Sequence, residues 1–85
     1  MNRLSSITVR VAQDGRMFFV IFHAPTTDDY QPDHACADVV EVFPDDSEKH
    51  LTHYELRWST LGNLFPIAAD LVASTIEYQK QRKKK

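Results

Sequence analysis

The chain has 85 residues, of which 42% are hydrophobic and 26% are charged, a composition that fits one small globular domain and leaves no room for a second core. Residues 1–79 hold all 12 acidic side chains and 5 of the basic ones, a formal balance of −7, whereas residues 80–85 add 5 basic ones. A body of this sign repels nucleic-acid phosphates and attracts basic protein surfaces. We therefore expect one acidic domain over residues 1–79 and a basic C-terminal tail over residues 80–85.

Several classes of protein are excluded by simple counts. A single cysteine, Cys36, cannot form an intrachain disulfide and favours a reducing compartment. No apolar run approaches the roughly 18 residues that span a bilayer, and residues 1–6 show no signal-peptide pattern. Only two glycines are present, which rules out a glycine-rich phosphate loop. We expect a cytoplasmic protein that does not enter a membrane.

The first predicted element is a β-hairpin. Residues 6–12 alternate between apolar and polar side chains, and Asp14-Gly15 follows as a strong signal for a two-residue primed turn. A second strand is predicted over residues 17–23. A two-residue turn fixes the register and places Val9 opposite Val20, so that one face of the hairpin is wholly apolar.

The other face of the second strand carries Met17, Phe19 and Ile21, which make it too apolar for a solvent-exposed surface that binds nothing. We expect this face to be covered by another protein, by the protein's own helix or by a second copy of the chain.

Residues 24–34 are rich in turn-forming side chains and are expected to form a linker. A third strand is predicted over residues 37–43, ended by the polar run of residues 44–48. Residues 53–58 alternate and predict a fourth strand, although residues 47–58 also fit a helix.

A C-terminal helix is predicted from Pro66 onward, because apolar residues then recur at helical spacing and proline suits a first turn. Asp70 near its start and Lys80 and Arg82 near its end match the helix dipole, and the lysines at the terminus are expected to fray. The fold class is therefore α+β: a four-stranded antiparallel sheet in β-β-β-β order, with one C-terminal α-helix packed on a face. The predicted core comprises Ile7, Val9, Val11, Phe18, Val20, Phe22, Val40, Leu56, Trp58, Leu64, Leu71 and Val72.

The histidines and the cysteine suggest two kinds of site, a zinc site and a nucleophilic cysteine. His34, Cys36, His50 and His53 could supply a tetrahedral zinc site, but a hairpin of residues 37–43 and 51–58 would separate the two pairs by about 23 Å. Cys36 with His34 as a base could act as a nucleophile, yet no third orienting group is recognisable. We therefore predict no cofactor, no metal and no catalytic residue, and a metal- or thiol-dependent site remains a third alternative.

The remaining hypothesis is a small non-enzymatic protein-binding module, such as an acidic inhibitor or accessory protein that occupies a basic, nucleic-acid-binding surface of a partner. An apolar centre rimmed by carboxylates fits such a partner. The main alternative is a single-stranded nucleic-acid-binding domain, with Phe19 and Tyr30 stacking on bases; a homodimer is also open. The acidic clusters do not match a calcium loop. The predicted binding residues are Met17, Phe19, Ile21, Asp28, Asp29, Asp45, Asp46 and Glu48.

Overall fold

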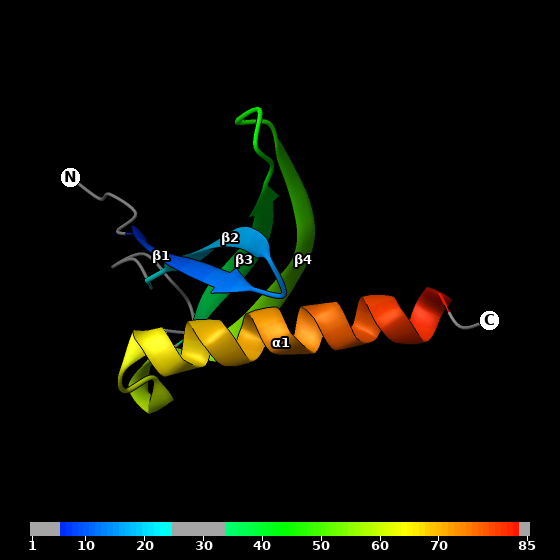
Figure 1. The fold of residues 1–85 in the computed structure, drawn as a ribbon. Helices are drawn as coiled ribbons and strands as arrows, with labels where there is room; N and C mark the ends of the chain where they lie inside the picture. The colour runs from blue at the N-terminus through cyan, green and yellow to red at the C-terminus, as the bar shows by residue number, and fades with distance from the viewer. Residues whose placement is uncertain (1–5, 25–33, 84–85) are drawn as a thin grey trace.

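The protein is described from a computed structural model, which places residues 6–24 and 34–83. The chain forms one antiparallel sheet of four strands in the order β1-β2-β3-β4, with a single long helix lying across one face (Figure 1). The elements are β1 (Ser6–Gln13), β2 (Arg16–His23), β3 (His34–Val42), β4 (Glu48–Arg57), a 3-10 turn η1 (Trp58–Thr60) and α1 (Leu64–Lys83). The α+β prediction is confirmed. Among the described residues, no helix is long and apolar enough to cross a membrane.

The β1–β2 hairpin has the predicted register. Val9 lies opposite Val20, and Gln13 and Arg16 close the turn. Asp14 and Gly15 both adopt positive φ, 55° and 71°, as a primed two-residue turn requires.

The core lies between α1 and the face of the sheet that α1 covers, which we call the core face. Its fully buried side chains include Phe18, Val20 and Phe22 from alternate positions of β2, and Val39 from β3. Helix α1 presents three buried residues at a spacing of four, Ala68, Val72 and Ile76, so that one stripe of the helix faces the sheet.

Helix α1 begins two residues before the predicted Pro66, because Asn63 caps it. The Asn63 side-chain oxygen accepts a hydrogen bond from the Phe65 backbone N–H at 3.1 Å. Pro66 then falls in the first turn, where its missing N–H is not needed. The helix continues to Lys83 and so includes residues 80–83 of the basic tail, while Lys84 and Lys85 lie outside the described residues.

Both strands of the second hairpin differ from prediction at their ends. β3 starts at His34 rather than residue 37, and β4 starts at Glu48 rather than residue 53. The helical alternative for residues 47–58 is wrong, since these residues pair with β3. Trp58 lies in η1, where it is half-buried.

Some predicted core residues lie elsewhere. Ile7 is 46% exposed at the outer end of the edge strand β1, because α1 does not reach it. Val40 is buried but lies on the sheet face opposite α1. Leu56, Leu64 and Leu71 are half-buried and pack against the edge of the core cluster.

A β-bulge in β4 changes which side chains share a face. Val39 pairs with Thr52 but Val40 pairs with His50, so Leu51 is the extra residue. Leu51 packs against the core cluster, and His50 is moved to the face opposite α1. His50 and His53, three residues apart, would point to opposite faces of a regular strand, but the bulge brings them to the same face.

Candidate functional site on the open face of the sheet

The face of the sheet opposite α1, here called the open face, carries an apolar stripe. Met17, Phe19 and Ile21 alternate with the core residues of β2 and so point away from α1. Their cross-strand neighbours on β3 are Val42 and Val40, paired with Met17 and Phe19. The three β2 side chains are only half-buried, and no described helix or strand lies over them.

A groove with a volume of about 540 Å³ occupies one end of this stripe, beside the turns of both hairpins. Met17, Phe19 and Val42 supply apolar walls, and Arg10 and Asp46 also line it. Two residues predicted as apolar anchors therefore share a groove with one of the predicted acidic residues. Ile21 lies farther along β2, on the same face.

The predicted acidic residues are placed by the turn between β3 and β4. The Asp46 N–H bonds the Phe43 carbonyl at 2.8 Å, the Phe43 N–H bonds the Ser47 carbonyl at 2.9 Å, and Asp46 between them has a positive φ of 70°. The Asp45 carboxylate accepts hydrogen bonds from the Ser47 N–H and hydroxyl, and these bonds lower the pKa of Asp45. Glu48 pairs with Val42 at the start of β4 and is exposed. Asp28 and Asp29 lie outside the described residues.

A salt bridge between β2 and β3 lies at the border of this groove. Arg16 donates two hydrogen bonds to Glu41, at 2.9 and 2.7 Å, and Glu41 is only 8% exposed. The bonds from Arg16 outweigh the burial of the carboxyl and hold the pKa of Glu41 below its usual value. Arg16 also lies over the Phe18 ring, 5.1 Å from its centroid. The guanidinium of Arg16 is therefore compensated by Glu41, which leaves Arg10 and Asp46 as the uncompensated charges at this groove.

All four histidines of the chain meet at the other end of the open face. The Asp38 carboxylate accepts hydrogen bonds from His23 Nε2 at 3.1 Å, His50 Nε2 at 3.0 Å and His53 Nδ1 at 2.8 Å. Glu55 accepts bonds from His34 Nε2 and from His53 Nε2, the latter at 2.7 Å. We call these six side chains the histidine network.

The histidine network shifts the pKa values of its members. Partial burial raises the pKa of Asp38, but the hydrogen bonds from His50, His53 and His23 outweigh it and lower the pKa from 3.8 to about 2. Both ring nitrogens of His53 face carboxylate oxygens, and both can donate only when the ring is cationic. The hydrogen bonds to Asp38 and Glu55 accordingly raise the pKa of His53. Glu55, bonded by His34 and His53, has a lowered pKa.

The sequence predicts that the pair His34 and Cys36 lies far from the pair His50 and His53. This prediction is wrong. Cys36 pairs with Glu55 and Asp38 pairs with His53, so Cys36 and His53 lie only two strand positions apart, about 7 Å. The prediction failed because it placed His50 at the closed end of a shorter hairpin. Within residues 6–24 and 34–83, no group of three or more histidine, cysteine and carboxylate side chains is arranged so that it could hold a metal ion.

Cys36 is poorly suited to act as a nucleophile. Burial raises the pKa of its thiol, and the Asp38 and Glu55 carboxylates raise it further. The reactive form of cysteine is the thiolate, which these surroundings disfavour.

The histidine network was missed because it depends on three strands and a bulge. Part of it was readable from the sequence, since His34, Cys36 and Asp38 alternate along β3 and so share a face. The positions of His50 and His53 relative to Asp38 follow from the bulge at Leu51, for which the sequence offers no local signal.

Comparisons of this chain with models of protein families, with curated proteins and with solved structures found no match.

Proposed function

We propose that the protein is a non-enzymatic protein-binding module whose open face docks on a basic surface of another protein, as an acidic inhibitor or accessory protein would. The observation that carries this proposal is the position of Met17, Phe19 and Ile21. They form an apolar stripe on the face that α1 leaves uncovered among the described residues.

The apolar stripe is suited to the centre of an interface. Aromatic and methionine side chains are enriched in the buried parts of interfaces, whose rims are polar. The groove of about 540 Å³ beside Met17 and Phe19 gives a partner side chain a concave place to enter.

The charges around the stripe favour a basic partner. Asp45, Asp46 and Glu48 are exposed at one end of the open face, whereas Glu55 at the other end is bonded by His34 and His53. Among the described residues, two cations line the groove: Arg16, which is bound to Glu41, and Arg10, which has no carboxylate bound to it. Excess carboxylates at the rim of an interface steer a positively charged surface into contact.

Affinity capture from a lysate of the source organism, quantified by mass spectrometry, tests the proposal. The baits are the wild-type protein, Phe19→Ala, and Ile7→Ala as a matched control, since Ile7 is an exposed apolar residue on the other face of the sheet. We expect a basic protein to be captured by the wild type and by Ile7→Ala, and lost with Phe19→Ala.

Two other results would contradict the proposal. Salt-sensitive binding of single-stranded DNA, abolished when residues 80–85 are deleted, would identify a nucleic-acid-binding domain. A concentration-dependent dimer that Phe19→Ala dissociates would show that a second copy covers the open face.

A further inference from the structure

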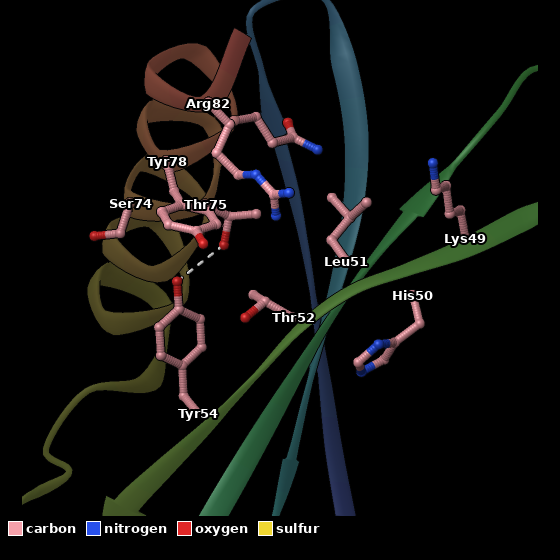
Figure 2. A pocket seen from close by; sticks show the side chains of 10 residues that line it. Lys49, His50, Leu51, Thr52, Tyr54, Ser74, Thr75, Tyr78 and Arg82 are labelled. Carbon is pink, nitrogen blue, oxygen red and sulfur yellow. Dashed lines mark hydrogen bonds between the residues drawn. The ribbon is translucent and has the colours of Figure 1, made fainter. Parts of the chain in front are cut away.

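A second groove, with a volume of about 600 Å³, lies on the other side of the molecule from the apolar stripe, between β4 and α1. Leu51, Thr52 and Tyr54 form its β4 wall, and Ser74, Tyr78 and Arg82 form its α1 wall (Figure 2). The groove exists because α1 packs on β1, β2 and β3 and meets β4 mainly near Tyr54. There the Tyr54 hydroxyl donates to Thr75 Oγ1 at 3.0 Å, and Thr75 in turn donates to the Leu71 carbonyl.

One wall of this groove is the free edge of a sheet. Within residues 6–24 and 34–83, β4 is the outermost strand and pairs only with β3. In the part of the chain that the structure describes, no backbone group of another segment bonds to the outer edge of residues 49–54. Unpaired N–H and C=O groups along an edge strand are a template for the addition of another strand.

Two cations lie at one end of the groove. Figure 2 shows Lys49 on β4 and Arg82 on α1 toward the end opposite Tyr54. None of the described residues that line the groove is a carboxylate. The nearby Glu41 is bound by Arg16 through two hydrogen bonds and also faces Lys49, its cross-strand neighbour. The Arg82 guanidinium lies 5.7 Å from the centroid of the Tyr78 ring, which holds it along the helix wall.

We propose that this groove binds an extended acidic peptide of a partner protein, which adds as a fifth strand to β4 and places its carboxylates against Lys49 and Arg82. Main-chain hydrogen bonds to an edge strand give such complexes their affinity, and side chains in the groove give them specificity. Residues 49–54 span about 20 Å, or about six residues of extended peptide, and the bulge at Leu51 requires the added strand to skip one pairing position. The groove adjoins the open face at His50, which lines one side of it, but its binding edge and its cations are other residues, so this proposal does not depend on the function proposed for the open face.

Fluorescence anisotropy with a labelled octapeptide of alternating valine and glutamate tests the proposal. We expect a Kd in the micromolar range, and a Kd at least about tenfold higher when alternate peptide amides are N-methylated, since these can no longer pair with β4. A peptide of alternating valine and lysine is expected not to bind.

Two protein variants with matched controls locate the site. Arg82→Glu should raise the Kd at least about tenfold, whereas Lys80→Glu, the same charge change on the same helix outside the groove, should leave it nearly unchanged. Ser74→Trp places a large ring at the helix rim of the groove and should raise the Kd at least about tenfold, but Ala73→Trp, exposed and outside the groove, should not. Circular dichroism verifies that each variant is folded.

Four results would overturn the proposal. Two concern the peptides: the glutamate peptide does not bind, or the N-methylated peptide binds as tightly as the unmodified one. The third is that Arg82→Glu and Lys80→Glu change the Kd equally. The fourth is that a single-stranded oligonucleotide competes for the same site and binds more tightly than the glutamate peptide.

Discussion

At the scale of single residues, Asp38 controls the charge of the open face. It lies at the centre of the histidine network, and three imidazoles bond to its two oxygens. His53 is held between Asp38 and Glu55, so its positive charge depends on both carboxylates. The charge that the open face presents to a partner is therefore coupled to pH through this network.

The raised pKa of His53 can be tested by substitution. In an NMR titration of the histidine ring protons, we expect His53 to titrate above its ordinary value of 6.5, and Asp38→Asn to lower that pKa. Asp70→Asn, an exposed carboxylate on α1, serves as the control and should leave it unchanged. A His53 pKa that does not respond to Asp38→Asn would show that the network does not form.

The lowered pKa of Asp38 also predicts how the stability of the protein changes in acid. Its pKa is lower in the folded protein than in the unfolded chain, so its contribution is fully present above the ordinary value of 3.8 and is lost as pH falls toward 2. Urea unfolding should show Asp38→Asn less stable than the wild type at pH 5–6, by at most about 2 kcal/mol, with the difference shrinking between pH 4 and pH 2. A difference independent of pH would contradict the low pKa.

At the scale of elements, the two hairpins differ in how far local sequence determines them. The Asp14-Gly15 turn fixes the register of β1 against β2, so alternation alone assigned every side chain there to the correct face. The second hairpin contains the bulge at Leu51, whose cause is the packing of that side chain against the core. Tertiary packing of this kind has no local signal, which is why the shared face of His50 and His53 was missed.

The Asp14-Gly15 turn allows a test of how strongly the local sequence determines the first hairpin. Replacing Gly15 with valine should lower the free energy of unfolding by about 1 kcal/mol or more, because a β-branched residue resists a φ of 71°. Gly62→Val is the matched control, since Gly62 has open space around it and no positive φ, and should cost less. Equal losses in chemical denaturation would mean that the conformation of the turn does not limit stability.

At the scale of the whole molecule, the open face and the groove between β4 and α1 carry different charged groups. The open face has exposed carboxylates at both ends, whereas the groove between β4 and α1 carries Lys49 and Arg82. The acidic balance of the sequence predicted the first surface, and the prediction of a covered or docking face remains to be tested. The second groove could not be predicted, because it follows from where α1 crosses the sheet (Figure 1).

The proposed docking of the open face makes separate kinetic predictions for charges and apolar anchors. Replacing Asp45, Asp46 and Glu48 with lysine should slow association with a basic partner and weaken its salt dependence, because rim charges act mainly on the encounter. Phe19→Ala should instead speed dissociation, at a cost of about 2 kcal/mol, if its ring is buried at the centre of the interface. Surface plasmon resonance separates the two rates, and a charge variant that altered only dissociation would argue against a steering role.

The most direct measurement of the central claim is an NMR titration of the isotope-labelled protein with the basic protein that it captures. We predict that the chemical-shift changes concentrate on the open face, at residues 17–21 of β2 and residues 40–46 of β3 and the following turn. Changes confined to α1 and to residues 49–54 of β4, with the signals of Phe19 and Ile21 unmoved, would contradict the assignment of the open face as the docking surface.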